Sequence, residues 1–204
     1  MEKSKSDFLA KQINKILNFY KSGDFQSIVS ISIKLLKKYP DFSPLYNFLG
    51  ISYRQLGNLK LAEKLLLEGY SKDPRNPGIL TNLGAIYRIK GNKEDSLKYF
   101  KESYKINPND IALLVNYANA LSDFNKVQES ISLLEKAKQI DNNNQTVLIN
   151  LASFYQNLGR FEDARNLLIE IIQKFPGLTI PHKMLSDITR YKINDKHHLQ
   201  MLKY

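Results

Sequence analysis

The chain has 204 residues, 43% of them hydrophobic, which is enough for one sizeable domain or a stack of small repeats. It contains no cysteine, which excludes a disulfide framework and a thiolate metal site and fits a reducing compartment. The net charge of +10 is spread out: residues 1–42 hold eight basic and four acidic residues, and residues 179–204 hold five and two. This spread argues against one concentrated phosphate-binding stripe.

The N-terminus and the hydropathy of the chain bear on its localisation. The first twelve residues, MEKSKSDFLAKQ, lack the apolar stretch of about 7–15 residues that a secretory signal needs. No apolar run approaches the roughly 20 residues that cross a bilayer. We therefore expect a soluble, cytoplasmic protein without a membrane partner.

The sequence repeats with a period of 34 residues. Segments that begin at residues 43, 77, 111 and 145 align without a gap, with a Gly or Ala at the eighth place of each. A small residue recurs in each second half, at Ala62, Ser96, Ser130 and Ala164, and a large one follows it four residues later. Apolar residues three and four apart form one helical stripe, and paired small residues let two helices approach closely. Each unit is therefore predicted to be a helical pair.

The first unit, residues 9–42, is degenerate. It keeps Phe19, Gly23, Phe25 and Pro40 in register. It departs from the other units at Lys15, Ile16 and Ile28, where they have Leu or small residues. These departures predict an end repeat with one solvated face, which a solenoid requires.

Residues 43–76, 77–110, 111–144 and 145–178 form the regular units. Ser43-Pro44 and Asn76-Pro77 are typical of a capping side chain followed by proline at the first helical position. Asp110 and Asn144 are predicted to cap the next two units. The first helices are predicted to end at Gly57, Gly91, Asn125 and Gly159, because Gly and Asn tolerate the left-handed conformation.

Residues 179–204 are predicted to close the stack. Residues 179–191 begin a sixth first helix that has no second half. Asp195 is predicted to cap a short further helix, and Leu199 and Leu202 of that helix are predicted to pack on the closing helix. The whole chain, 1–204, is predicted to be a single domain.

This pattern resembles the tetratricopeptide repeat, a helix–turn–helix unit of 34 residues. The resemblance covers four clear units over 43–178 and a weaker one at 9–42. It implies an all-α fold, a right-handed superhelical α-solenoid of such repeats with a C-terminal capping helix. It also implies a non-enzymatic scaffold that binds a peptide or a partner segment in a concave groove lined by the first helices.

Three units carry an asparagine at the sixth place: Asn82, Asn116 and Asn150. In the groove they would form a ladder with rungs roughly 10 Å apart, so an extended chain would meet one amide about every third residue. An amide donates and accepts hydrogen bonds and can pair with any peptide group. The alternative is that Asn is generic at this place and bonds neighbouring backbone or water; the sequence leaves both open.

Further groove residues follow from the same helical faces: Asn47, Ile51, Arg54, Arg88, Asn119, Ser122 and Gln156. Arg54 and Arg88 lie one period apart and are suited to hold a carboxylate, with solvated surface arginines as the alternative. The resemblance also implies what to exclude. The carboxylate clamp of chaperone-binding members needs lysines where this chain has Ile13, Asn47 and Ala112, so a chaperone tail is not the expected partner.

No catalytic constellation is present. The glycines punctuate helices instead of forming a phosphate loop, and His197 and His198 would point about 100° apart on a helix and not share a metal. We expect no enzymatic activity, no cofactor, no metal site and no small-molecule ligand. Nucleic-acid binding through the basic surface is an alternative, although most of the 12 Tyr and 10 Phe residues occupy core places.

The C-terminal tail suggests another alternative. It resembles the segment that joins tetratricopeptide arrays to a sulfotransferase-like domain in bacterial two-domain proteins. That likeness is carried by His182, Leu185, Ser186, Asp195, His197 or His198, and Met201. It implies that the chain is either the N-terminal, substrate-recruiting arm of a larger sulfotransferase- or glycosyltransferase-like enzyme or a stand-alone relic of one.

Overall fold

The computed structural model describes residues 2–189, with side chains from residue 7 onward. Every regular element in this range is an α-helix, as predicted. The chain divides into two compact units, unit 1 over residues 1–108 and unit 2 over residues 109–204, and each is described by itself. The predictions for Asp195, His197, His198, Leu199, Met201 and Leu202 lie outside the described residues.

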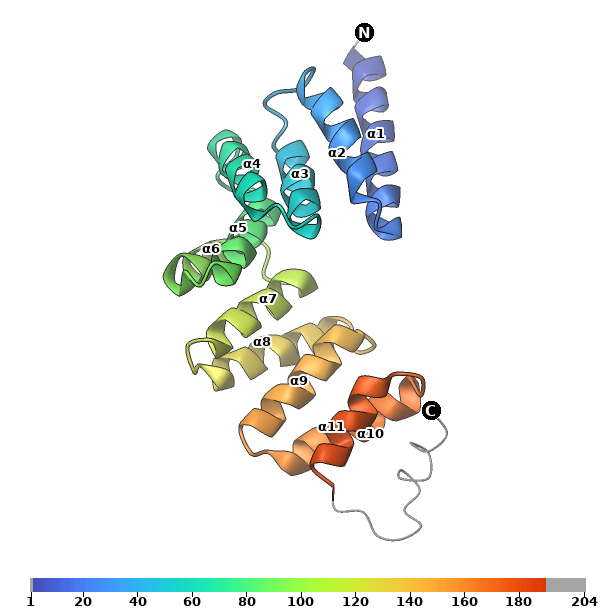
Figure 1. Ribbon diagram of the computed structural model, residues 1–204, viewed down its shortest axis with the longest axis vertical. Coiled ribbons are helices and arrows are strands. Elements are labelled where there is room, and N and C mark those ends of the chain that lie inside the picture. Colours follow the sequence, from blue (N-terminus) through green and yellow to red (C-terminus); the bar gives the residue numbers. More distant parts are fainter. Residues whose placement is uncertain (1, 190–204) are drawn as a thin grey trace. The chain divides into compact units, whose positions relative to one another are not determined.

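Unit 1 consists of three helical pairs (Figure 1). They are α1 (Glu2–Ser22) with α2 (Phe25–Leu36), α3 (Ser43–Gln55) with α4 (Leu59–Lys72), and α5 (Pro77–Ile89) with α6 (Lys93–Ile106). Successive pairs meet through α2 against α3 and through α4 and α3 against α5. Two buried clusters result, one around Ile16, Ile28 and Leu45, and the other around Leu66, Ile79 and Leu83.

Unit 2 repeats the same design in its described part (Figure 1). It contains α7 (Ile111–Ser122) with α8 (Val127–Ile140), α9 (Gln145–Asn157) with α10 (Phe161–Lys174), and the single helix α11 (Thr179–Asp187). One buried cluster runs through it from Ala118 to Leu185. The predicted closing helix is present and packs on α10.

The ends of the helices follow the predicted turn chemistry with one exception. Gly57, Gly91, Gly159 and Asn125 all adopt positive φ, between 59° and 81°. The side chains of Asn76, Asp110 and Asn144 accept hydrogen bonds from backbone N–H groups three residues later. The expectation that Ser43 caps α3 is wrong, because Ser43 is the first helical residue. Its hydroxyl instead donates to Asp73 and accepts from Asn76, so it ties α3 to the loop before α5.

Close approach within each pair requires the small residues. A Cβ atom added to Gly84 would lie 2.8 Å from the ring of Phe100, and one added to Gly50 would overlap Leu66. Two serines exploit the same proximity: Ser96 Oγ donates to Gly84 O at 2.9 Å, and Ser130 Oγ donates to Ala118 O at 2.8 Å. The buried hydroxyls of Ser96 and Ser130 are thereby satisfied.

The first pair obtains its packing by exchanging large and small residues. Ile16 occupies the place of Gly50, and Ser32 occupies the place of Leu66, one period earlier. Ile16, Ile28 and Ser32 are all 0% exposed. The departures Ile16 and Ile28 therefore do not mark a solvated face, as the sequence suggested. They belong to the core, where Ile16 is large on α1, Ser32 is small on α2, and Ile28 adds a large residue on α2.

Candidate functional site

The predicted site residues lie on the first helices of their pairs. In unit 1, α3 carries Asn47 and Arg54, and α5 carries Asn82 and Arg88. In unit 2, α7 carries Asn116 and Asn119, and α9 carries Asn150 and Gln156. Because the three ladder asparagines belong to two units, their alignment stays a prediction, and each unit supplies its own geometry.

Asn47 and Asn82 form an amide pair in unit 1. The Nδ2 group of Asn82 donates to Asn47 Oδ1 and to Gly78 O, both at 2.9 Å, which uses both of its hydrogens. The bonds formed by the described residues leave the Nδ2 hydrogens of Asn47 and the Oδ1 atom of Asn82 unused. One donor and one acceptor are the complement of a peptide group.

The Asn47 amide also lies close to Gly78. A Cβ atom added to Gly78 would stand 2.8 Å from Asn47 Nδ2. Glycine at this place therefore makes room for the amide pair, and Asn82 itself is only 9% exposed. The hydrogen bond from Asn82 holds the Asn47 amide in a fixed orientation.

Arg54 lies on the same face of α3, two turns after Asn47. Its side chain is half-buried, and this burial lowers the pKa of the guanidinium, while the nearby phenol of Tyr20 opposes the shift. Among the described residues, no hydrogen bond or ion pair is formed by Arg54. A partly desolvated cation without a counter-ion gains from an added carboxylate, especially one that accepts two hydrogen bonds.

Two residues of α1 extend this face, and the groove residues predicted from the sequence did not include them. Leu17 and Tyr20 stand in the register of Ile51 and Arg54, one period earlier, and they are 41% and 46% exposed. The signal was available, because the 34-residue period already covers residues 9–42. We define the first-helix face of unit 1 by the following residues: Leu17, Tyr20, Asn47, Ile51, Arg54 and Asn82.

The predicted residues of unit 2 are engaged within the chain to different degrees. Asn116 donates to Ala112 O at 2.8 Å, the same bond to the preceding turn that Asn82 makes to Gly78. Gln156 donates to Met184 O at 3.0 Å and thereby ties α9 to α11. Asn119 and Asn150 are half-buried. A local bond from the sixth-place Asn to its own helix is thus one of its roles in both units.

Other kinds of site find no support in the part of the chain that the structure describes. No group of three or more His, Cys, Asp or Glu residues is placed to hold a metal ion within that part. His182 is buried, and its Nε2 atom lies 3.2 Å from Pro176 O. None of the described helices combines the length and the apolar character needed to cross a membrane.

Comparison with known proteins agrees with this architecture. Family models described as tetratricopeptide repeat match residues 77–110 and 123–186. No curated protein is significantly similar to the chain in sequence.

Solved structures with this fold are similar to most of the chain. A thermophilic TPR protein of Thermus thermophilus is 17% identical with a TM-score of 0.72, over 88% of this chain and 97% of that one. The APC/C hetero-tetramer Cut9–Hcn1 is 20% identical with a TM-score of 0.81, over 92% of this chain and 38% of that one. YrrB, a TPR protein with an unusual peptide-binding site, is 16% identical with a TM-score of 0.62, over 83% and 88%. The family models identify tetratricopeptide repeats at residues 77–110 and 123–186, and the 34-residue period, the helical pairs and these solved structures show the tetratricopeptide-repeat fold.

Proposed function

We propose that the protein is a non-enzymatic interaction scaffold, and that the first-helix face of unit 1 binds an extended segment of a partner protein. The tetratricopeptide-repeat fold supports a protein–protein interaction scaffold in general. The observation that carries the specific proposal is the Asn47–Asn82 pair, which offers one donor and one acceptor two helical turns from an uncompensated Arg54.

The spacing of these groups defines the ligand. Seven residues separate Asn47 from Arg54, a rise of roughly 10 Å along the helix, and an extended chain covers that distance in about three residues. The ligand is therefore a segment with an Asp, a Glu or a C-terminal carboxylate about three residues from the peptide group held by the amide pair. Leu17, Tyr20 and Ile51 add apolar contact beside it.

Gly78→Ala tests the amide pair without weakening the fold. The new methyl group must displace the Asn47 amide, whereas the backbone at Gly78, the second residue of α5, has no positive φ and accepts alanine. A peptide selected from a random display library should bind Gly78→Ala several-fold more weakly by calorimetry, while the urea unfolding midpoint does not fall. Gly177→Ala is the matched control, since no atom lies within 4 Å of its added methyl.

Arg54 provides a second, independent test. Arg54→Ala should weaken the selected peptide at least tenfold and Arg54→Lys by an intermediate amount, because lysine keeps the charge but loses the bidentate geometry. Replacing the acidic residue of the peptide by its amide should have the same effect as Arg54→Ala and no further effect in that variant. If the library yields no ligand, or if both variants bind as the wild type does, the first-helix face of unit 1 is not the binding site.

The amide ladder across the repeats is tested separately. Asn82, Asn116 and Asn150 are replaced together by Ala, and capture of the partner segment and helicity are measured. Loss of capture with unchanged helicity supports the ladder. Unchanged capture leaves only the local role seen in the bonds to Gly78 and Ala112.

A further inference from the structure

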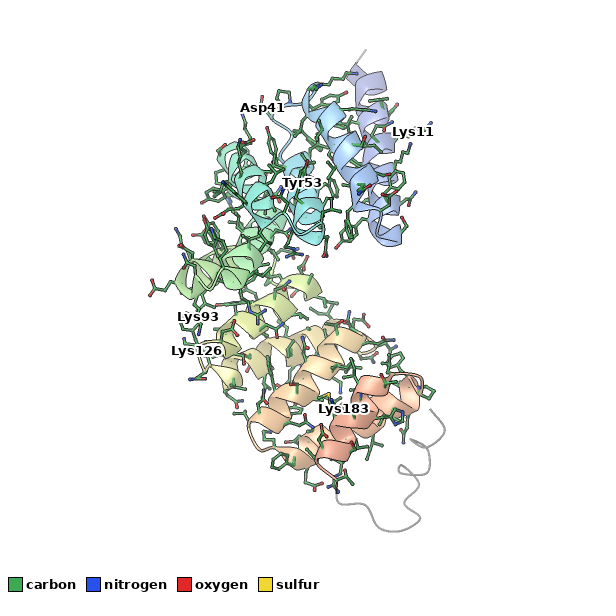
Figure 2. All side chains as sticks on the ribbon, viewed as in Figure 1. Lys11, Asp41, Tyr53, Lys93, Lys126 and Lys183 are labelled. Atoms are coloured by element: carbon green, nitrogen blue, oxygen red, sulfur yellow. The ribbon has the colours of Figure 1, made fainter. Side chains whose placement is uncertain are left out.

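A second surface of unit 1 lies on the other side of α3. A cavity of about 440 Å³ opens between α2 and α4, with α3 as its floor. Six apolar residues line it: Ile33, Leu36, Leu49, Tyr53, Leu61 and Leu65. We call it the α2–α4 groove. Tyr53, labelled in Figure 2, belongs to its floor.

The α2–α4 groove is distinct from the first-helix face. Successive residues of a helix are rotated by about 100°, so Leu49 and Tyr53 point roughly opposite to Asn47, Ile51 and Arg54 on α3. A ligand in one surface does not touch the residues of the other. Binding in the α2–α4 groove is therefore independent of the proposed function of the first-helix face.

Two corresponding places in the repeats differ from this apolar groove. In unit 2 a cavity of about 530 Å³ lies between α8 and α10 over α9, three periods later. Its floor is similar in kind, with Leu151 and Tyr155, but its walls carry Glu135, Lys138 and Asp163. Those three residues stand in the register of Ile33, Leu36 and Leu61.

The intermediate place in unit 1, between α4 and α6, is occupied by tyrosines. Tyr99 stacks on Tyr87 with ring centroids 5.5 Å apart, and Tyr70 meets Tyr99 edge-on at 5.9 Å. Tyr99 stands in the register of Leu65. The corresponding place is polar in unit 2 and filled by tyrosines between α4 and α6, whereas the α2–α4 groove is open and apolar.

We propose that the α2–α4 groove docks an amphipathic helix of a partner protein, with large aliphatic residues on one face and acidic residues beside them. The aliphatic residues of that helix match the lining of the groove. The walls are helices whose backbone groups are already paired within each helix. The lining side chains are mostly apolar and, unlike the Asn47–Asn82 pair, offer few hydrogen bonds to an extended strand. A helix, which pairs its own backbone groups, therefore suits this groove better.

Charge argues for the acidic residues of the partner. Residues 25–38, which include α2, hold three lysines and no acidic residue. One of them, Lys37, lines the groove, and among the described residues neither Lys37 nor Lys34 forms an ion pair. On α4, Lys60 adjoins Leu61 in sequence, and Lys64, which lies 3.9 Å from Glu68, adjoins Leu65. Acidic residues on the partner helix complement this positive surface and speed its approach.

The test uses a fluorescein-labelled helical peptide with leucines on one face, glutamates on both sides of them and alanine elsewhere. Its affinity for the full chain is measured by fluorescence anisotropy. The key variant combines Ile33→Glu, Leu36→Lys and Leu61→Asp, which gives this groove the wall residues of unit 2. Because the same fold carries those residues in unit 2, the variant should stay folded, which circular dichroism checks.

The variant should bind the peptide at least about tenfold more weakly than the wild type does, equivalent to about 1.4 kcal/mol. Ile169→Glu, which changes a side chain that is 40% exposed on α10, should bind as the wild type does. Arg54→Ala should also leave this affinity unchanged. A peptide with lysine in place of each glutamate should bind several-fold more weakly, and rising salt should reduce that difference.

Three results would overturn the proposal. They are no binding of the peptide by the wild type, equal binding by the wild type and the triple variant, and equal binding of a scrambled peptide that lacks an apolar face. If the triple variant loses helicity, Ile33→Glu alone carries the same test, because Ile33 is 41% exposed. Self-association of the wild type that Ile33→Glu abolishes, seen by analytical ultracentrifugation, would assign the groove to a second copy of the chain instead.

Discussion

At the scale of single residues, small side chains permit the contacts between paired helices. Gly84 lies against the ring of Phe100, and Ser96 in the partner helix donates its hydroxyl to the carbonyl of Gly84. A methyl group at Gly84 would displace a fully buried ring, and displaced rings in a close-packed interior do not find another low-energy rotamer. The residue is therefore required for the distance between α5 and α6.

Gly84→Ala is expected to destabilise the protein by about 1–3 kcal/mol, the usual cost of overpacking. The measurement is urea unfolding followed by circular dichroism. Gly177→Ala, where no atom lies within 4 Å of the added methyl, should change stability by less than about 0.5 kcal/mol. Equal effects at the two glycines would show that α5 and α6 can separate without cost.

At the scale of elements, the first helical pair solves the same packing problem in the opposite way. The later pairs put the small residue on the first helix and the large one on the second, as Gly50 and Leu66 do. The first pair has Ile16 on α1 and Ser32 on α2, both fully buried. Since a Cβ atom at Gly50 would meet Leu66, the register predicts that Ile16 faces Ser32, and the two positions should then be coupled in energy.

A double-mutant cycle measures this coupling. Ile16→Ala alone should cost about 2–5 kcal/mol through the cavity that it leaves, and Ser32→Leu alone about 1–3 kcal/mol through overpacking. The double variant should cost clearly less than the sum, by about 0.5 kcal/mol or more, because the new leucine enters the vacated space. Additive effects would mean that the two positions do not share one volume.

A second element-scale contact links α8 and α10 in unit 2. Glu170 accepts hydrogen bonds from Lys174 at 2.9 Å and from Lys138 at 3.1 Å. The bond from Lys174 is the main cause that lowers the pKa of Glu170, and burial opposes it. A carboxyl whose folded-state pKa is lowered stabilises the fold above its unfolded pKa, and that stabilisation disappears as the pH falls through the folded-state pKa.

Glu170→Gln should therefore lower stability at neutral pH and have little effect in acid. The pair is partly exposed, so the loss at neutral pH should not exceed about 1 kcal/mol. Thermal unfolding of both proteins at neutral pH and at a pH below the folded-state pKa of Glu170 gives the comparison. A difference in melting temperature that persists unchanged in acid would indicate a packing effect of the substitution instead of the loss of the charge pair.

At the scale of the whole molecule, the distribution of the net charge of +10 does not favour a nucleic-acid site. The basic residues are dispersed along the chain, and several are committed to ion pairs, such as Lys72 with Asp41 and Lys90 with Glu63. Some aromatic rings are engaged as well, since Tyr99 packs on two other tyrosines. Burial, with nearby Tyr and acidic groups, raises the pKa of Tyr99 to about 12. Packed rings of this kind are not presented for base stacking.

Binding to RNA is accordingly expected to be weak and non-specific. A salt titration of binding to a single-stranded RNA should show affinity only at low ionic strength, with none measurable near about 150 mM salt. Fluorescence anisotropy with a labelled oligonucleotide provides the measurement. Sub-micromolar binding at that salt concentration would favour the nucleic-acid alternative over a protein scaffold.

The sequence by itself determined the repeat and almost all of its helices. The 34-residue period placed the helical pairs, the left-handed turns at Gly57, Gly91, Asn125 and Gly159, and the caps at Asn76, Asp110 and Asn144. These features are local: they depend on backbone torsion angles, on side chains within one turn, and on which stripe of a helix is apolar. They recur because each unit solves the same local problem.

Only the tertiary structure decided how side chains from different helices are used. It showed that the large residue Ile16 and the small residue Ser32 are both buried in the first pair. It showed that both amide hydrogens of Asn82 bond within the chain, to Asn47 and Gly78. It also showed that the α2–α4 groove is open, whereas Tyr99 fills the corresponding place in the next repeat. The period aligns residues at the same place in each repeat, but it does not predict which side chains are in contact between helices. Contact between helices depends on the sizes of side chains on both sides of an interface, and these vary from one repeat to the next.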